Sequence, residues 1–194
     1  FTKVIFSSDS DKYIDIALKI NKKLEIHKRN AKISSATASE YSVFEDYINN
    51  NNKVLPLYFA HLRPTNPIRN INTIKKVIKK FKQIQNKYSC MRLLNETSKP
   101  TYWSCGVKNN QVYTAFNSDY DVNKLWLARQ TFKKTYFINC HIDLYKTHHI
   151  IKNKNLWGKK VYGYIDNDST IVDIDTNEDF HYAEYIMSKK TKKI

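Results

Sequence analysis

The segment 71–84 constrains the fold more than any other part of the sequence. Its apolar residues recur at helical spacing, at Ile71, Ile74, Ile78, Phe81 and Ile84. The opposite face is basic, with lysines at positions 75, 76, 79, 80 and 82. Because such a helix must bury its apolar stripe, the spacing predicts a helix over 71–84 that packs against another layer of structure.

Apolar runs that predict buried strands alternate with helical patterns along the chain. We expect strands over residues 1–6, 54–60 and 170–175. The spacing of Tyr13, Ala17, Ile20 and Leu24 indicates a first helix. A capping box at 37–40 indicates a second helix, with Tyr41, Phe44 and Ile48 on one face. Thr176 caps a last helix, which continues through Glu184. The alternation predicts an α/β fold with a mainly parallel sheet and helices on both faces.

Residues 1–194 are expected to form a single domain, because the sequence contains no apparent repeat or linker. The stretch from about 88 to 131 is less regular, with strand-like pieces near 102–105 and 111–116, and we interpret it as an inserted dimerisation arm. The chain opens on Phe1, directly in an apolar run, so we expect the domain to be incomplete at its N-terminal end.

The composition argues against several classes of protein. An apolar content of 41% is too high for intrinsic disorder, and the longest apolar run, 54–60, is too short to cross a membrane. Three cysteines without CxxC spacing indicate neither a disulfide framework nor a zinc ribbon, so a reducing, cytoplasmic setting is expected. The histidines lack metal-site spacing, and GxGxxG, Walker A and GxSxG motifs are absent.

The net charge of +15 raises nucleic-acid binding as one class of function. A basic surface rich in tyrosine and phenylalanine offers phosphate contacts and base stacking. The lysines, however, fall on the outer faces of amphipathic helices, where solvation explains them, and no RNP-type or helix-turn-helix pattern accompanies them. We therefore do not expect nucleic acid as the partner.

The pair Asp173 and Asp175 is the strongest candidate for chemistry. Residues two apart in a strand point to the same face, so both carboxylates can converge on one divalent cation. Oxygen ligands of this kind suit Mg²⁺ that is bound together with substrate phosphates. The alternative is that they are polar positions before a helix, a description that fits Glu178 and Asp179 better because the helix dipole favours anions in the first turn.

Three further segments carry candidate binding residues. The loop 63–69 has two prolines that fix its shape, Arg63 and Arg69 for anionic oxygens, and Thr65 and Asn66 as hydrogen-bonding groups, although an ordinary proline-rich turn explains it equally. Arg129 and Gln130, followed by the segment 135–139 that ends at Asn139, could clamp the carboxylate of an acidic sugar, although an Arg-Gln dipeptide by itself is background. Residues 27–29 could hold a nucleotide or form a solvated basic turn.

Five collinear segments together resemble the CMP-sialic acid synthetase family, the acylneuraminate cytidylyltransferases. The family's "VSTDS" is similar to Ile5-Phe-Ser-Ser-Asp-Ser10, and its "RRSxExS" to residues 28–34 with the Ser/Thr-rich stretch to Ser39. "LQPTSPLR" is matched by Leu62-Arg-Pro-Thr-Asn-Pro-Ile-Arg69, and "RQxLPxTYxxNG" by residues 129–140. "DIDTxxDFxxAE" is matched by Asp173-Ile-Asp-Thr-Asn-Glu-Asp-Phe-His-Tyr-Ala-Glu184. The resemblance covers essentially the whole chain.

The resemblance implies a Rossmann-like nucleotidyltransferase fold, a homodimer, and transfer of CMP from CTP to a nonulosonic acid such as sialic acid with release of pyrophosphate. It implies that Asp173 and Asp175 hold Mg²⁺ and align the α-phosphate. Arg29, Ser39, Arg63 and Thr65 are then the nucleotide-binding residues, and Arg129, Gln130 and Asn139 meet the acidic nine-carbon sugar. Because such chemistry depends on positioning and charge neutralisation, arginines and a metal are the expected equipment.

The sequence departs from the family at defined positions. Nothing matches the opening signature "ARxGSKxxxxKN", which supplies an Arg and a Lys to the triphosphate. The family's Gln before Pro-Thr is Arg63 here, its Asn-Gly is Asn139-Cys140, and its Leu-Pro is Phe132-Lys133. The alternatives that stay open are a sister enzyme for pseudaminic or legionaminic acid and a catalytically inactive relative. An enzyme for 3-deoxy-manno-octulosonic acid fits less well, since that group usually carries "QGDEP" where this chain has residues 63–67.

Overall fold

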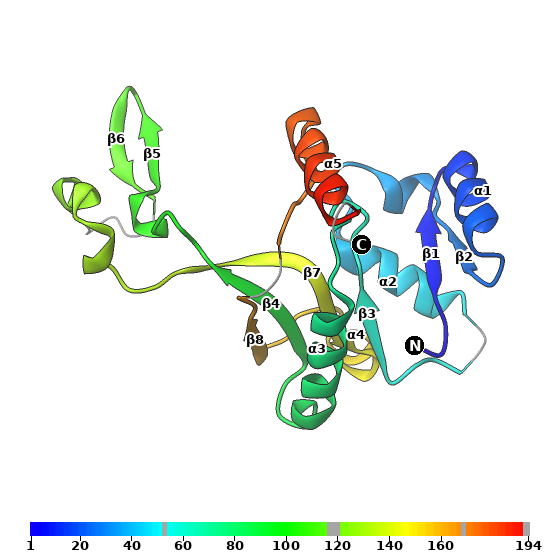
Figure 1. The fold of residues 1–194 in the computed structure, drawn as a ribbon. Helices are drawn as coiled ribbons and strands as arrows, with labels where there is room; N and C mark the ends of the chain where they lie inside the picture. The colour runs from blue at the N-terminus through cyan, green and yellow to red at the C-terminus, as the bar shows by residue number, and fades with distance from the viewer. Residues whose placement is uncertain (52–53, 116–120, 168–169, 192–194) are drawn as a thin grey trace. The chain divides into compact units, whose positions relative to one another are not determined.

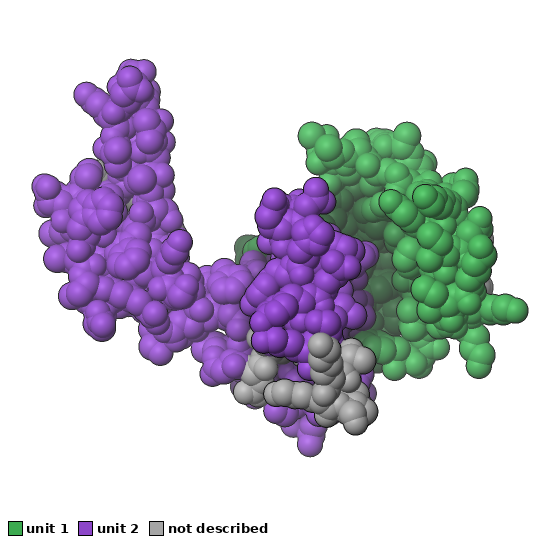
Figure 2. Space-filling model, turned by 45° about the horizontal axis from the view of Figure 1, so that its top comes forward, with its two compact units in different colours: residues 1–59, 145–160 green, residues 60–144, 161–194 purple. Residues whose placement is uncertain are grey.

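A computed structural model describes residues 1–51, 54–115, 121–167 and 170–191 of the chain. The chain divides into two compact units, which Figure 2 shows in green and purple. Unit 1 contains residues 1–59 and 145–160, and unit 2 contains residues 60–144 and 161–194. Figure 1 gives the order of the elements along the chain.

Unit 1 begins with a parallel β-α-β arrangement. Strand β1 (Ile5–Ser8) pairs with β2 (Glu25–Lys28), and helix α1 (Asp11–Ile20) connects them. A helix is confirmed here, but it ends at Ile20, before the predicted Leu24. Its buried residues are Ile14 and Ala17, whereas Ile20 is 82% exposed. The predicted strand over 1–6 is shifted, because residues 1–4 lie outside it and are exposed.

The rest of unit 1 packs around aromatic side chains. Helix α2 (Glu40–Asn49) contacts α4 (Thr147–Asn153), and the 3-10 turn Ala31–Ser34 precedes α2. Phe44 makes edge-to-face contacts with Phe59 and with Tyr145, each with ring centroids 5.5 Å apart. Such pairs favour one packing arrangement over a loosely collapsed core.

Four strands form the larger sheet, in the order β3 (Tyr58–His61), β7 (Tyr136–Lys146), β4 (Cys90–Glu96), β8 (Val161–Ile165). The prediction of a mainly parallel sheet is wrong for this sheet, because it is mixed. β4 and β8 are parallel, whereas the side-chain pairs Asn95–Asn139 and Arg92–Asp143 show that β4 and β7 run antiparallel. The described residues between β4 and β7 contain no α-helix that could cross over the sheet, and a parallel pair would need such a crossover.

Helix α3 (Ile71–Ile84) has the bounds that the periodicity predicts. Its buried residues are Thr73, Ile74, Val77 and Phe81. The Asn70 side chain caps the first turn by accepting a hydrogen bond from the Asn72 amide, and most of the lysines are exposed. One of them, Lys80, is half-buried, with its ammonium 5.7 Å from the ring centroid of Tyr162 on β8.

Two predicted strands differ from the structure. The strand expected over 54–60 begins only at Tyr58, and Val54 is 99% exposed. Pro56 lacks the amide that a strand interior requires, which explains the late start. Residues 170–174 form no strand, although buried or half-buried side chains alternate with exposed ones from Val172 to Asp175.

The chain leaves the sheet after β4 and returns at β7 through residues 97–135, which we call the arm. It contains the antiparallel pair β5 (Cys105–Lys108) and β6 (Gln111–Thr114), and 3-10 turns at Thr101–Trp103, Val122–Trp126 and Arg129–Thr131. Asn109 and Asn110 form the hairpin turn with φ of 51° and 62°, the left-handed values that a two-residue I′ turn needs. The predicted irregular stretch thus starts later than residue 88, since 90–96 is a sheet strand, and Phe116 lies outside the described residues.

Unit 2 ends with helix α5 (Asn177–Thr191), whose Ala183 packs in a small core with Ile68 and Val172. This cluster joins the end of the proline-rich loop to the segment that carries Asp173 and Asp175. None of the helices in the described part of the chain has the length and apolar content that a membrane span requires.

Candidate active site

Hydrogen bonds hold the proline-rich loop 62–69 against β7. The Asn66 side chain is fully buried and donates from Nδ2 to the Asn139 carbonyl at 3.0 Å. The Arg69 guanidinium donates to the carbonyls of His141 and Arg63. The two prolines restrict the loop further, so its conformation is set before any ligand binds.

A buried carboxylate on β7 forms an ion pair with Arg63. Asp143 on β7 is fully buried and accepts hydrogen bonds from Arg63 at 2.7 Å and from Arg92 on β4 at 2.9 and 2.7 Å. Burial lowers the pKa of Arg69, and the nearby charge of Arg63 lowers it further. Two arginines therefore pair with one buried carboxylate, and a third, Arg69, lies near Arg63, which gives a basic setting for anionic groups.

Asn139 is buried and fixes the turn that follows it. Its Nδ2 donates to Asn95 Oδ1 at 2.6 Å, and its Oδ1 accepts from the His141 amide at 3.0 Å. Cys140 has a φ of 56°, in the left-handed region that glycine adopts most easily. Burial raises the pKa of the Cys140 thiol, with smaller effects from the charges of Arg63, Asp143 and Asp173, so this turn lies within electrostatic range of Asp173.

Asp173 and Asp175 lie on one side of an extended segment. Val172 is buried and Ile174 packs on the same core, whereas both carboxylates are exposed. The Ile174 amide donates to the Thr65 carbonyl at 2.8 Å, which ties this segment to the proline-rich loop. The predicted strand is wrong, but the alternation on which the argument for a shared face depends is present.

Asp179 has a structural role at the start of α5. Thr176 and Asp179 form a capping box at the start of α5, in which Asp179 Oδ2 accepts from the Thr176 amide at 3.0 Å and Thr176 Oγ1 accepts from the Asp179 amide at 3.2 Å. Hydrogen bonds from Thr176 and from the Asp175 amide hold the pKa of Asp179 below its usual range. Asp179 is thus a capping residue, as expected for an acid in the first turn.

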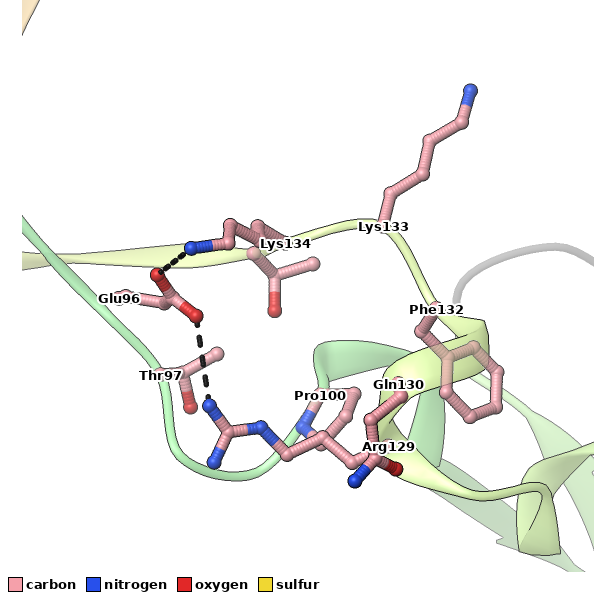
Figure 3. A pocket seen from close by; sticks show the side chains of 9 residues that line it. Glu96, Thr97, Pro100, Arg129, Gln130, Phe132, Lys133 and Lys134 are labelled. Atoms are coloured by element: carbon pink, nitrogen blue, oxygen red, sulfur yellow. Dashed lines mark hydrogen bonds and ion pairs between the residues drawn. The ribbon is translucent and has the colours of Figure 1, made fainter.

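Arg129 and Gln130 line a separate pocket at the base of the arm. The pocket has a volume of about 310 Å³ and is lined by Glu96, Thr97, Pro100, Arg129, Gln130, Phe132, Lys133, Lys134 and Thr135. Figure 3 shows Glu96 between two cations, with contacts of 2.8 Å to Lys134 and 3.5 Å to Arg129. Three basic residues and one acid give this lining a net positive charge.

The remaining candidates belong to unit 1. Arg29 pairs with Asp9 at 3.0 Å, and its buried Nε has no hydrogen-bond partner among the described residues. Ser39 is the N-cap of α2 and accepts from the Ser42 amide at 3.2 Å, so the cap lies two residues after the Thr37 that the capping-box pattern indicates. His27 is buried, with its ring nitrogens 3.0 Å from Ser7 Oγ and 2.8 Å from Asp46 Oδ2.

Comparison with known proteins decides the family. A family model described as "Cytidylyltransferase" matches residues 1–193. The chain belongs to the cytidylyltransferase family. This cytidylyltransferase is 25% identical, over 193 residues, to "Post-translational flagellin modification protein B" of Campylobacter coli, covering 98% of the chain and 79% of that protein. It is also 25% identical to the "N-acylneuraminate cytidylyltransferase" of Escherichia coli O18:K1:H7 over 199 residues, all of this chain but only 44% of that protein.

The fold of the cytidylyltransferase is also found among solved structures. It is similar to a CMP:2-keto-3-deoxy-manno-octonic acid synthetase solved in complex with CTP, with a TM-score of 0.65. The match covers 97% of this chain and 81% of that chain at 10% sequence identity. At this identity the likeness shows only that the two chains share an α/β fold.

The structure of the cytidylyltransferase brings together some of the predicted site residues. Arg63, Thr65, Asn139, Asp173 and Asp175 gather around the proline-rich loop of unit 2. Arg129 and Gln130 line the pocket of the arm, whose lining does not include the first group, and Arg29 and Ser39 belong to unit 1. The ligand contacts predicted for all of these residues stay predictions.

Sequence reasoning missed Arg92, Asp143 and Glu96. Arg92 and Asp143 are single charges of opposite sign inside apolar runs, Cys90-Met-Arg-Leu-Leu94 and Ile142-Asp-Leu-Tyr145. Because a buried charge needs a partner, these two interruptions indicated a cross-strand ion pair. Glu96 carries no comparable signal, since it stands in a polar stretch at the end of its strand.

Proposed function

We propose that this cytidylyltransferase transfers CMP from CTP to the anomeric hydroxyl of a sialic-type nonulosonic acid and releases pyrophosphate. The family match and the activity named for the Escherichia coli relative support the class of reaction. The same relative and the CTP complex of the structural neighbour support the two substrates, a cytidine nucleotide and an acidic sugar.

One observation carries the proposal. Asp173 and Asp175 are exposed on one side of their segment, and the hydrogen bond from Ile174 to Thr65 ties that segment to the loop that bears Arg63. Carboxylates thus lie next to a loop with two half-buried arginines, one of which, Arg63, shares the buried Asp143 with Arg92. Reactions at phosphorus need such an arrangement, because catalysis depends on positioning and on neutralising phosphate charge.

Mg²⁺ is the metal that this donor set fits. The described residues contain no group of three or more His, Cys, Asp or Glu side chains arranged to hold a metal. Two carboxylates suit an ion that keeps water and substrate phosphates as its other ligands. We propose that Asp173 and Asp175 hold Mg²⁺, which when bound would neutralise charge on the α-phosphate.

The reaction joins the anomeric oxygen, whose proton is released to solvent, to the α-phosphorus. It breaks the bond from that phosphorus to the bridging oxygen, so pyrophosphate leaves with the electron pair. The chain's own task is to bind and orient the two substrates. Arg63, Thr65, Arg29 and Ser39 are proposed to contact the nucleotide. Arg129 and Gln130 are proposed to hold the carboxylate of the sugar in the positively charged pocket of the arm, and Asn139 to shape the sugar site through the turn at Cys140.

Pyrophosphate release by the purified protein tests the proposal. We expect release only when CTP, a nonulosonic acid and Mg²⁺ are all present. Release from CTP without an acid, or no release with any acid of the panel below, would contradict it. Mg²⁺ removal by a chelator should stop the reaction, and added Mg²⁺ should restore it.

A comparison of kcat/KM among candidate acids shows which acid the protein uses. A match of 27% identity over 84 residues links 43% of this chain to the "CMP-N,N'-diacetyllegionaminic acid synthase" of Campylobacter jejuni, which keeps legionaminic acid as an alternative. The panel therefore contains N-acetylneuraminate, diacetyllegionaminate, pseudaminate and 2-keto-3-deoxy-manno-octonate. We expect a higher kcat/KM for a nine-carbon acid than for the eight-carbon one.

We also propose that the arm mediates a homodimer. It exposes Trp126 at 90% and Val107 at 66%, together with Val112 and Tyr113 on the neighbouring strand. Large apolar side chains exposed close together on a projecting segment favour burial against a partner. Light scattering should give twice the mass of the chain, and a Trp126→Ser, Val107→Ser variant should give a monomer.

A further inference from the structure

The pocket of the arm contains an acid in the position of a ligand. Its lining has three cations, Arg129, Lys133 and Lys134, and the single anion Glu96. In Figure 3 the Lys133 side chain extends away from the others, whereas Arg129 and Lys134 approach Glu96 from two sides. The pair of cations and the Glu96 carboxylate leave one net positive charge, which matches a ligand with one carboxylate.

The contacts of Glu96 are easily exchanged. Its carboxylate gives one oxygen to Lys134 at 2.8 Å and the other to Arg129 at 3.5 Å, a long and single contact. A guanidinium has five N–H donors and binds a carboxylate best through two parallel hydrogen bonds. Arg129 and Lys134 are more than half exposed, and exposed ion pairs contribute little free energy. A ligand carboxylate therefore replaces Glu96 at a small cost in free energy.

From this arrangement we infer that Glu96 is an internal competitor for the acidic sugar. In the ligand-free protein its carboxylate occupies Arg129 and Lys134, and the carboxylate of the sugar takes over these two cations when it binds. Glu96 thereby weakens the binding of the sugar and sets the concentration at which the pocket fills. The inference deepens the proposed function and rests on its assignment of the sugar carboxylate to Arg129.

The charge state of Glu96 supports this role. The hydrogen bond from Lys134 and the charge of Arg129 hold the pKa of Glu96 below its usual range, so it is an anion at neutral pH. Replacing Glu96 by Gln keeps the size of the side chain and removes the charge. The variant pocket then presents two cations without a competing anion.

Direct binding of N-acetylneuraminate, or of whichever acid of the panel above the protein uses, tests the inference by calorimetry. We expect Glu96→Gln to lower the Kd by about two- to fivefold, the range that exposed ion pairs allow. The KM for the acid should fall by a similar factor while kcat changes little. The methyl ester of the same acid, which has no charge, should bind both proteins equally.

Two further variants separate the possible failures. Asp15→Asn removes one exposed carboxylate from α1 in unit 1 and should leave the Kd unchanged, which excludes an effect of total charge. Arg129→Ala should weaken binding at least tenfold. If Arg129→Ala has no effect, or if no acid binds, the sugar assignment and the inference both fail. If Arg129→Ala weakens binding but Glu96→Gln leaves the Kd unchanged or raises it, only the inference fails.

Discussion

Asp143 and Arg92, on neighbouring strands β7 and β4, form a buried ion pair in which Nε and Nη2 of the guanidinium reach both carboxylate oxygens, at 2.9 and 2.7 Å. Arg63 adds a third contact to the same carboxylate from the proline-rich loop. The sheet and the candidate active site therefore share one buried charge. Removing that charge leaves arginines in the protein interior without their carboxylate, which is costly.

Asp143→Asn should destabilise the protein by about 3–5 kcal/mol, because breaking a buried pair leaves an uncompensated charge. Denaturant titration followed by tryptophan fluorescence measures the change. Asp173→Asn is the matched control, since it removes the same charge from an exposed position and should change the free energy of unfolding by less than about 0.5 kcal/mol. Equal effects of the two substitutions would contradict the structural role of Asp143.

The left-handed backbone at Cys140 predicts that glycine is preferred over alanine there. An L-residue pays about 1–2 kcal/mol in this conformation, part of which glycine loses again through its greater freedom in the unfolded chain. Cys140→Gly should therefore be more stable than Cys140→Ala by about 0.5–1 kcal/mol. The same pair of substitutions at Cys90, inside strand β4, should give the opposite order, and the same order at both positions would refute the explanation.

The capping box of α5 should make part of the stability depend on pH. The pKa of Asp179 is lowered in the folded protein, so its carboxylate stabilises the fold above the pKa of the unfolded chain, near 3.9, and this contribution is lost as the pH falls through the lower folded value. The melting temperature of Asp179→Asn should thus lie below that of the unsubstituted protein at pH 7 and converge with it in strong acid. A difference that stays constant from pH 7 to pH 2 would show that the charge of Asp179 is not responsible.

Strong local patterns allowed parts of the fold to be predicted. Helix α3 was predicted with its bounds, because Ile74 and Phe81 repeat on a face that lysines avoid. The strand over 54–60 was misplaced because its apolar run includes Pro56, which has no amide to donate to the strand ladder. Strands β4 and β7 were missed because Arg92 and Asp143 break their apolar patterns.

The candidate site was predictable only in part, because local patterns reveal residues close in sequence but not contacts between distant ones. Asp173 and Asp175 were found because their spacing places both on one side of an extended segment. The contact between Arg63 and Asp143 joins residues 80 positions apart, and no local pattern encodes such a distance. The pairing of Glu96 with Arg129 likewise depends on where the chain enters and leaves the arm, which the spacing of residues does not reveal.

Asp175 is proposed to take part in nucleotidyl transfer. The most direct test compares pyrophosphate release from CTP and the preferred acid by Asp175→Asn and by Glu178→Gln, which removes an exposed charge in the first turn of α5. We predict that Asp175→Asn lowers kcat at least 100-fold, about 2.7 kcal/mol of transition-state stabilisation, with an unchanged circular dichroism spectrum. Glu178→Gln should keep its activity. Full activity of Asp175→Asn would contradict the account.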